Sequence, residues 1–429
     1  MKIRIIILFT FLFSQELLAQ KYLLDSIRPS LGHLIKEEYN VLQYADSSAN
    51  FNKFLVSLDS IYKGKQNSLQ IIHIGGSHIQ ADAYSNKIRE YLRNNSPFNE
   101  SPRGLIFPFR LAGTNNPGNY SVSGNKENWQ RYRSAVRSDS ATWGLSGINV
   151  KLIADSDTLV IKANHKNNVL KPYYFDKIRL FTDADPSTYC VKLSDSLVRI
   201  TSDTVLSDFA IREYVLSDTM QTASLIISYS DSIVDRGFNL MGIELQNSMP
   251  GVQYTSIGVN GASFESFARC GLFYKQLSLY KPDLFIVSIG TNDAYTTDFK
   301  ADKYREYYKS LLDSVLKINP ECALLLTVPN DSYYRRKHPN RNTVVQQEII
   351  HKLAAEYNAA VWDFYAIMGG LGSSQRWYNN KLMPRDRIHF TPLGYSIKAD
   401  LLLTALASQW EKAFGYEPGT ILNKLTGKP

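Results

Sequence analysis

The stretch IIHIGGSHIQAD (residues 71–82) decides the fold, because it passes from one type of structure to another at a single corner. Its apolar, β-branched first half predicts a buried strand. Gly75 and Gly76 then permit a tight turn. Further apolar residues recur in helical phase, namely Ala81, Tyr84, Ile88 and Leu92. The sequence therefore places Ser77 where a strand ends and a helix begins. Taken alone, this is also the pattern of a plain helix N-cap serine.

The same alternation returns in the last third of the chain. Short apolar runs at residues 283–290, 323–328 and 360–364 predict further strands. Two amphipathic helices are expected between them, with faces formed by Tyr304, Tyr308, Leu311 and Val315 and by Val345, Ile349, Leu353 and Tyr357. Strands alternating with helices predict an α/β fold, a parallel sheet covered on both faces.

The middle of the chain has a different texture. Its short, β-branched segments are separated by Asp, Ser and Asn turns, which is typical of a β-sandwich, here expected to be jelly-roll-like. Because α/β texture lies on both sides, we interpret it as a domain inserted into a loop. The expected segments are a signal peptide at 1–19, a helical lead-in at 20–70, the first part of the α/β domain at 71–104, the inserted domain at 105–250 and the second part of the α/β domain at 251–429.

The first residues have the pattern of a secretory signal peptide. Lys2 and Arg4 precede an apolar run at 5–13, and cleavage is expected near Ala19 or Gln20. This run is far shorter than the ~20 residues that a membrane-spanning helix needs. No later segment has transmembrane character. We therefore expect an exported protein, periplasmic or extracellular, with no integral membrane span in the mature chain.

The composition limits the partners. Removal of the signal peptide would change the net charge from +8 to +7, a surplus that aids solubility or favours anionic wall polymers. We find no Lys/Arg block and no basic stripe with interleaved aromatics, so nucleic acid is not an expected partner. The three cysteines, Cys190, Cys270 and Cys322, are too few and too scattered for a disulfide framework or a zinc site, and we expect them to be small buried side chains.

A second informative stretch, PRDRIHFTPLGYSIKAD, occupies residues 384–400. Thr391 followed by Pro392 predicts the start of a helix, so His389 is expected on the loop before it, with Asp386 three residues away. A serine hydroxyl needs a base to remove its proton, and that base needs a partner that fixes its tautomer. His389 and Asp386 suit those roles towards Ser77, although a surface ion pair is the default explanation of a D-x-x-H pair taken alone.

Two glycine-containing turns supply candidate donors for an oxyanion. SIGVNGAS (residues 256–263) leaves the backbone N–H of Gly261 unencumbered, and SIGTNDAY (residues 288–295) offers the side-chain amide of Asn292. Either segment could be only a turn. Preorganised donors of this kind typically contribute ~3–4 kcal/mol each to acyl-transfer catalysis, so their joint presence is informative.

Taken together, the four blocks GGSH, GVNGAS, GTND and DRIHF resemble, in chain order, those of the SGNH (GDSL-like) hydrolases. The resemblance implies a flavodoxin-like three-layer α/β/α fold, Ser77, Asp386 and His389 as catalytic residues, and an oxyanion hole formed by Ser77, Gly261 and Asn292. It implies no metal and no cofactor. One position departs from the family, because Gly76 stands where an Asp is usual. That Asp is not the proton-relay carboxylate, so the chemistry is expected to survive.

The insertion point is also similar to that of bacterial peptidoglycan O-acetylesterases, which carry a carbohydrate-binding-module-like β-sandwich between the serine and glycine blocks. Trp377 and His78 are our candidate substrate-binding residues. His78 is also a weaker candidate for a second base. Three aromatics near the start of the insertion either stack on sugars or belong to its core, namely Tyr120, Trp129 and Trp143. The spacing of His73, His78 and Asp82 fits no standard metal motif.

The sequence therefore predicts an exported serine esterase that removes O-acetyl or other small acyl groups from an acylated cell-envelope polysaccharide, with peptidoglycan as the leading candidate. Two alternatives remain open at this stage. One is a polysaccharide O-acetyltransferase, which shares the first half of the reaction. The other is a non-catalytic wall-polysaccharide binding protein, for which Gly76 is the sequence argument.

Overall fold

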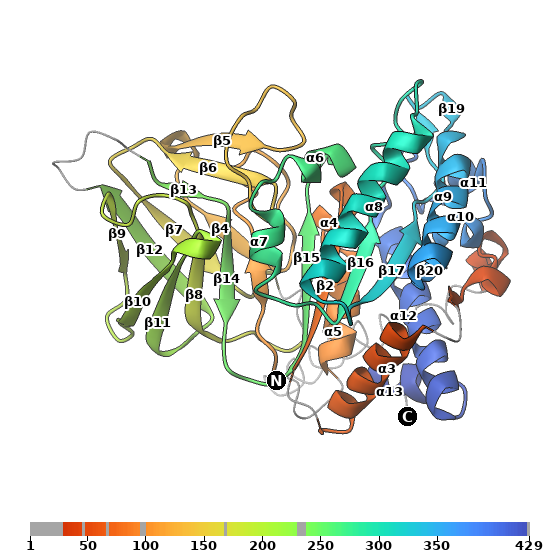
Figure 1. The fold of residues 1–429 in the computed structure, drawn as a ribbon, viewed down its shortest axis with the longest axis horizontal. Coiled ribbons are helices and arrows are strands. Elements are labelled where there is room, and N and C mark those ends of the chain that lie inside the picture. Colours follow the sequence, from red (N-terminus) through yellow and green to blue (C-terminus); the bar gives the residue numbers. More distant parts are fainter. Residues whose placement is uncertain are drawn as a thin grey trace, which may run out of the picture.

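The fold is described from a computed structural model of the chain, which describes residues 29–44, 48–65, 68–94, 100–166, 170–229 and 237–426. The predicted signal peptide at residues 1–19 lies outside the described residues. Figure 1 shows two regions side by side, a β-rich region and an α/β region, with the long helices gathered in the latter.

The α/β region is built on a six-stranded sheet in the order β1-β20-β17-β16-β2-β15. Five of these strands run parallel to one another. In chain order they are β2 (Ser68–Gly75), β15 (Gly251–Gly258), β16 (Leu284–Ser288), β17 (Ala323–Val328) and β20 (Ala360–Asp363). Numbered by their own sequence they lie in the order 2-1-3-4-5, which is flavodoxin-like and confirms the predicted fold class. The strand order reverses between β2 and β16, where such sheets place their sites.

Helices cover both faces of this sheet, because successive side chains of a strand point to opposite sides. In β2, Ile72 and Ile74 join one hydrophobic core, whereas Leu69 and Ile71 join another. The first core receives α6 (Phe264–Ala268), α7 (Phe273–Leu277), α8 (Ala301–Ile318) and α9 (Asn342–Tyr357). The second receives α3 (Ala49–Tyr62), α5 (Tyr84–Asn94), α10 (Phe364–Ile367), α11 (Ser373–Asn379), α12 (Pro392–Phe414) and α13 (Thr420–Thr426). The result is three layers (Figure 1).

The helical periodicity of the sequence predicts the positions of the helices well. It predicts which residues of each helix are buried less well. In α8 all four residues of the predicted face are buried. In α9, Ile349 and Leu353 are buried, but Val345 is 39% exposed and Tyr357 is half-buried. The helix predicted to run on from Ser77 is instead broken into α4 (Ser77–Gln80) and α5, because Asp82 adopts a left-handed conformation with φ +46°.

The lead-in is less uniformly helical than expected. It contains α3, whose predicted apolar residues Phe51, Phe54, Leu55 and Leu58 are all buried. It also contains the short 3-10 helices η1 (Gly32–Leu34) and η2 (Glu37–Tyr39), followed by β1 (Leu42–Gln43). Strand β1 pairs antiparallel with β20. The lead-in therefore contributes an edge strand to the sheet as well as packing on it.

Residues 104–246 form three antiparallel sheets within the described part of the chain. The five-stranded sheet has the order β10-β11-β8-β14-β3, the four-stranded sheet β4-β7-β12-β9 and the three-stranded sheet β13-β6-β5. The strands are β3 (Gly104–Ile106), β4 (Ser121–Ser123), β5 (Trp129–Arg133), β6 (Ile148–Leu152), β7 (Ser156–Lys162), β8 (Phe175–Phe181), β9 (Tyr189–Leu193), β10 (Ile200–Leu206), β11 (Ile211–Met220), β12 (Thr222–Tyr229), β13 (Asn239–Leu240) and β14 (Gly242–Gln246).

The chain enters and leaves this β-rich region at neighbouring points. Strand β3, where it enters, pairs with β14, where it leaves, through Ile106 opposite Ile243. Adjacent entry and exit strands are what an insertion into a loop requires.

Two further expectations are answered by the described residues. No helix in them is long and apolar enough to span a membrane. The three cysteines are all free, and Cys270 and Cys322 are buried as predicted. Cys190, in β9, is exposed, which corrects the prediction for that residue.

Candidate active site

The serine corner depends on two glycines at the end of β2. A Cβ atom on Gly75 would lie 2.3 Å from Cγ1 of Ile79 and 2.8 Å from the carbonyl oxygen of Ser288, so no larger residue fits there. A Cβ atom on Gly76 would lie 3.1 Å from Nδ2 of Asn292. The glycine that stands where an Asp is usual therefore allows close approach of the Asn292 amide beside Ser77.

Ser77, His389 and Asp386 form one hydrogen-bonded chain. The Oγ atom of Ser77 lies 2.9 Å from Nε2 of His389, and Nδ1 of His389 lies 2.8 Å from Oδ2 of Asp386. When Nδ1–H donates to the carboxylate, the lone pair on Nε2 faces the serine hydroxyl, the tautomer that a general base needs. The hydrogen bond between Ser77 and His389 spans 312 residues of sequence, so the fold alone brings these groups together.

The Asp386 carboxylate is held as an anion. Burial alone would raise its pKa, but the hydrogen bond from His389 and the backbone N–H of Ile388, which donates at 2.8 Å, outweigh burial. The pKa of Asp386 therefore lies well below its ordinary value. An ionised carboxylate at this point can stabilise a positive charge that develops on the imidazole.

Two loops bring donors to the same corner. Gly261 has φ +84°, in the region that favours glycine, and its backbone N–H makes no hydrogen bond to another described residue. The Nδ2 atom of Asn292 donates to the carbonyl oxygen of Ala262 at 2.8 Å, and its second N–H remains available. Because Gly76 approaches both Asn292 and Ala262, the glycine and asparagine blocks converge beside Ser77.

Asp293 joins these two loops, a role that the sequence analysis missed although the residue lies in the GTND block. Its Oδ1 accepts the backbone N–H of Phe264, the first residue of α6, at 3.1 Å. Burial raises the pKa of Asp293 to about 7. The carboxyl group therefore fixes the Asn292 loop against the segment that follows Gly261.

Gln80 is a second residue that the sequence analysis did not identify. Its Oε1 accepts the backbone N–H of Asn260 at 2.6 Å. Its Nε2 donates to Oγ1 of Thr114 at 2.9 Å and to the carbonyl oxygen of Asn115 at 2.8 Å. One side chain thus links the serine helix, the glycine loop and the β-rich region. No local sequence motif indicates this role of Gln80, because the role depends on loops that are distant in sequence.

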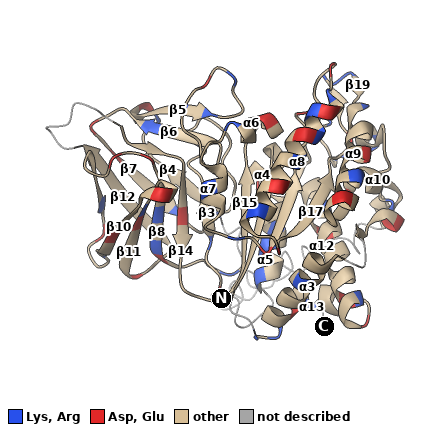
Figure 2. Cartoon of the chain, in the orientation of Figure 1, with Lys and Arg blue, Asp and Glu red and all other residues tan. Residues whose placement is uncertain are grey.

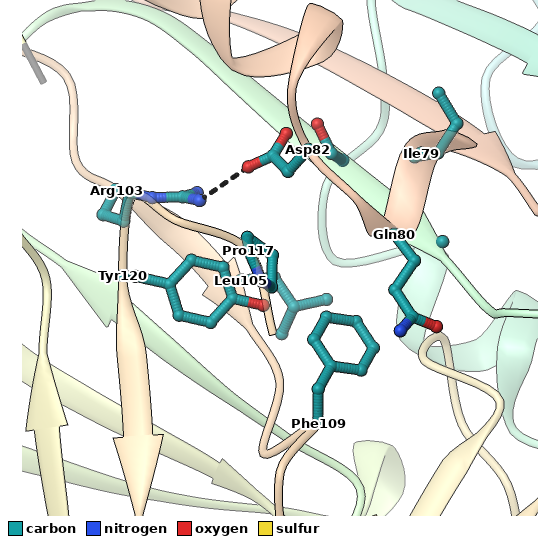
Figure 3. Close-up of a pocket in the computed structure, with 10 residues that line it drawn as sticks. Ile79, Gln80, Asp82, Arg103, Leu105, Phe109, Pro117 and Tyr120 are labelled. Atoms are coloured by element: carbon teal, nitrogen blue, oxygen red, sulfur yellow. Dashed lines mark hydrogen bonds and ion pairs between the residues drawn. The ribbon is translucent and has the colours of Figure 1, made fainter. Parts of the chain in front are cut away.

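Asp82, at the break between α4 and α5, is the centre of a buried network. It accepts hydrogen bonds from Arg89 at 2.9 and 3.0 Å, from Arg103 at 3.1 Å and from Asn119 at 2.8 Å. Burial would raise its pKa, but the two guanidinium groups outweigh burial and lower the pKa to about 2. Figure 3 shows the ion pair with Arg103 beside a cavity of about 10 Å³, which has room for a water and not for a sugar.

His78 does not line a substrate pocket, which corrects that prediction. Its side chain is buried, with Nδ1 2.9 Å from the hydroxyl of Tyr395. Its ring centroid is 5.3 Å from that of His389. Burial, assisted by the charge of Lys398, holds the pKa of His78 well below its ordinary value. His78 is therefore a neutral ring that packs behind His389, in no position to contact substrate or act as a second base.

Trp377 is also not a pocket wall. It is fully buried and packs edge-on against Phe364 and Phe390, at centroid distances of 5.9 and 5.7 Å. Its amphipathic ring fills the core below the His389 loop. The short distance in sequence between Trp377 and that loop was therefore misleading. The three aromatics near the start of the β-rich region, Tyr120, Trp129 and Trp143, are likewise core residues with at most 5% exposure.

The residues considered for a metal site are engaged separately. His73 is buried between the hydroxyl of Tyr254, at 2.5 Å, and Oγ of Ser288, at 2.7 Å. Burial lowers its pKa to about 3. Across the described ranges, no group of three or more His, Cys, Asp or Glu side chains is arranged to hold a metal ion.

Comparisons with known proteins agree with this fold. Residues 224–397 match the GDSL-like Lipase/Acylhydrolase family. A solved peptidoglycan O-acetylesterase is similar with TM-score 0.67 and 20% identity, over 86% of this chain and 99% of that one. An acetylxylan esterase from Geobacillus stearothermophilus is similar with TM-score 0.29 and 20% identity, over 39% of this chain and 74% of that one. No curated protein matches the chain.

The family match is that of a carboxylic ester hydrolase. Residues 224–397 form a domain similar to the GDSL-like lipases and acylhydrolases. The matched segment begins within β12 and ends within α12, so it excludes Ser77. The serine block is separated from the rest of the domain by the β-rich region.

Proposed function

We propose that the protein is an exported serine esterase that removes O-acetyl groups from a cell-envelope polysaccharide, with peptidoglycan as the substrate. The observation that carries the proposal is the chain of hydrogen bonds from Ser77 through His389 to Asp386. Complete acyl-transfer machinery favours an enzyme over a binding protein whose site has decayed.

The choice of substrate has a separate basis. The similarity to the peptidoglycan O-acetylesterase extends over 86% of this chain, so it includes the β-rich region as well as the α/β region. Export is proposed from the charged and apolar pattern of residues 1–19, which is typical of a signal peptide.

In the proposed mechanism, the Nε2 atom of His389 removes the proton of Ser77 as Oγ attacks the acetyl carbonyl carbon. Asp386 stabilises the imidazolium that results. The carbonyl π electrons move to oxygen, and this oxyanion is stabilised by the backbone N–H groups of Ser77 and Gly261 and by the free amide N–H of Asn292. The sugar hydroxyl then leaves with the proton from His389, and acetyl-Ser77 remains.

In the second half of the reaction, His389 removes a proton from water, which attacks the acetyl carbonyl. The same donors stabilise the second oxyanion. Collapse returns the proton to Oγ of Ser77 and releases acetate. The protein residues alone account for every proton transfer in this scheme.

The test is acetate release from O-acetylated peptidoglycan by the mature protein and by Ser77→Ala, with a small aryl acetate as a second substrate. Removal of the nucleophile should lower kcat by about 10⁵-fold or more, with no change in thermal unfolding. Ser278→Ala, at a half-buried serine that directly follows α7, serves as the matched control. Residual activity of Ser77→Ala within tenfold of wild type would rule out the serine mechanism. Activity on the aryl ester alone would preserve the mechanism and exclude peptidoglycan.

A further inference from the structure

A short hairpin beside the site carries a cluster of positive charge. It consists of β18 (Tyr333–Tyr334) and β19 (His338–Pro339), with Arg335, Arg336 and Lys337 in the turn between them. These three successive basic residues correct the prediction that the chain has no Lys/Arg block. Figure 2 places the hairpin, labelled β19, at the end of the α/β region that lies away from the β-rich region. We call residues 333–339 the basic hairpin.

The basic hairpin is attached to the loop of the catalytic histidine. The backbone N–H of Tyr333 donates to the carbonyl oxygen of Arg387 at 3.2 Å, and Nη2 of Arg387 donates to the carbonyl oxygen of Arg336 at 2.6 Å. Arg387 lies between Asp386 and His389 in sequence. The hairpin is therefore fixed beside the base of the proposed reaction.

A second attachment leads to the oxyanion side of the site. The backbone N–H of Arg335 donates to the hydroxyl of Tyr295 at 3.0 Å, and Tyr295 follows Asn292 by three residues. The rings of Tyr295 and Tyr334 are in contact, with centroids 5.0 Å apart. The hairpin thus bridges the two loops that approach Ser77, and a polymer whose ester reaches Ser77 passes close to it.

No carboxylate of the described residues neutralises the charges of the hairpin. Arg335, Arg336 and Lys337 are exposed, and none of them has a carboxylate within 4 Å among the described residues. Arg385, exposed on the neighbouring loop, also makes no ion pair there. Arg335 and Arg336 have φ of +50° and +60°, a region that arginine seldom adopts. The turn therefore projects three cations into solvent from strained backbone.

Aromatic rings accompany these cations. Tyr295 is 38% exposed, and the guanidinium group of Arg335 lies 5.2 Å from the ring centroid of Tyr334. Rings of this kind can stack on sugar faces, and guanidinium groups bind carboxylates in a bidentate manner. The combination matches a glycan that carries carboxylates better than it matches a neutral glycan or a lipid.

We propose that the basic hairpin binds carboxylate groups of the polymer, so that the enzyme selects acylated glycans with carboxylates near the ester over neutral acylated glycans. This inference rests on the proposed esterase function and names the class of its substrate. In peptidoglycan the peptide stems would supply these carboxylates.

The first test compares wild type with the triple variant Arg335→Asn, Arg336→Asn, Lys337→Gln. Asparagine is used at the two left-handed positions because it tolerates that conformation. The substrates are O-acetylated peptidoglycan, the same polymer with its carboxylates amidated, and a small aryl acetate. On the untreated polymer, kcat/KM should fall roughly tenfold, mainly through KM, as expected for three exposed charge contacts. The amidated polymer and the aryl acetate should be hydrolysed within twofold of wild type.

A charge-matched control separates local from general electrostatics. The variant Lys192→Gln, Arg199→Gln, Lys412→Gln removes three exposed cations elsewhere on the protein. It should leave all three substrates unaffected. The inference is overturned if the hairpin variant hydrolyses the untreated polymer as wild type does, if it loses equal activity on the amidated polymer, or if the control variant behaves in the same way.

A binding measurement distinguishes failure of this inference from failure of the proposed function. Ser77→Ala protein, with and without the hairpin substitutions, is sedimented with peptidoglycan from which the esters have been removed by alkali. Binding that requires the hairpin supports the inference even if wild type releases no acetate from any polymer. Binding that does not require the hairpin, or no binding at all, overturns the inference even if the esterase activity is confirmed.

Discussion

Two aspartates near the serine corner, Asp386 and Asp82, show how one physical device serves different purposes. Each carboxylate accepts several hydrogen bonds that together lower its pKa. Asp386 is partly exposed, and one of its donors is an imidazole whose second nitrogen reaches Ser77. Asp82 is buried, and its charged donors are guanidinium groups, which do not give up a proton. A carboxylate that is kept ionised can therefore assist catalysis when two conditions are met. Its hydrogen-bond donor must be able to give up a proton, and that donor must lie where substrate can reach.

The largest expected effect tests the chemical half of this comparison. Asp386→Asn should lower kcat by about 10⁴-fold, because the amide cannot hold His389 in the tautomer that serves as a base. The midpoint of thermal unfolding should change little, since the position is partly exposed. Hydrolysis of an aryl acetate and thermal unfolding provide the two readouts. A loss of less than tenfold in kcat would contradict the role assigned to Asp386.

The next largest effect tests the structural role of Asp82. Asp82→Asn should lower the free energy of unfolding by about 3–5 kcal/mol, because it leaves two buried guanidinium groups without their counter-charge. Urea unfolding measures the loss, and kcat of the protein that remains folded should stay within about tenfold of wild type. The matched control is Asp203→Asn, which breaks the more exposed pair with Arg212 and should cost less than about 1 kcal/mol. Equal losses for both variants would mean that burial of the Asp82 network does not matter.

A third prediction, with an expected effect of similar size, tests the role of Asn292 in the oxyanion hole. Asn292→Ala should lower kcat by about 10²- to 10³-fold, with KM nearly unchanged, because the donor acts mainly on charge that develops in the transition state. The same variant also removes the hydrogen bond to Ala262, so thermal unfolding must be measured beside the kinetics. A normal kcat in a folded variant would exclude the Asn292 side chain from the oxyanion hole.

The smallest effect concerns pH. The pKa of Asp82 is about 2 in the folded protein, against an ordinary value of 3.8. A lowered folded pKa gives stability that is present above pH 4 and lost as the pH falls to about 2, and the shift corresponds to about 2 kcal/mol. Urea unfolding of wild type and Asp82→Asn at several pH values measures this. The difference in free energy of unfolding between the two proteins should become smaller as the pH falls from 4 to about 2. A difference that stays constant would contradict the lowered pKa of Asp82.

The sequence was informative where a function depends on a local pattern. The parallel strands of the sheet, the faces of α3 and α8 and the strand-to-helix corner at Ser77 were all predicted from short-range periodicity. The convergence of the four blocks required knowledge of the family, because Ser77 and His389 meet only through the order of strands in the sheet. Their catalytic roles stay predictions until the variants above are measured.

The sequence was uninformative where a role depends on contacts between distant segments. Gln80 and Asp82 lie inside the stretch 71–82, yet their partners Asn115 and Arg103 are placed by the path of the chain into the β-rich region. The prediction that Trp377 lines a pocket was wrong because the direction of its side chain also depends on the tertiary fold. Its distance along the chain from His389 is short, but the side chain turns into the core rather than towards the site.

The separation of Ser77 from His389 by 312 residues also has a consequence for biosynthesis. At about 5–20 residues per second, translation takes roughly 15–60 s to pass from the serine to the histidine. Throughout that time the nascent chain holds a serine without its base. Ester hydrolysis by the proposed mechanism can therefore begin only after His389 has been made and has reached Ser77.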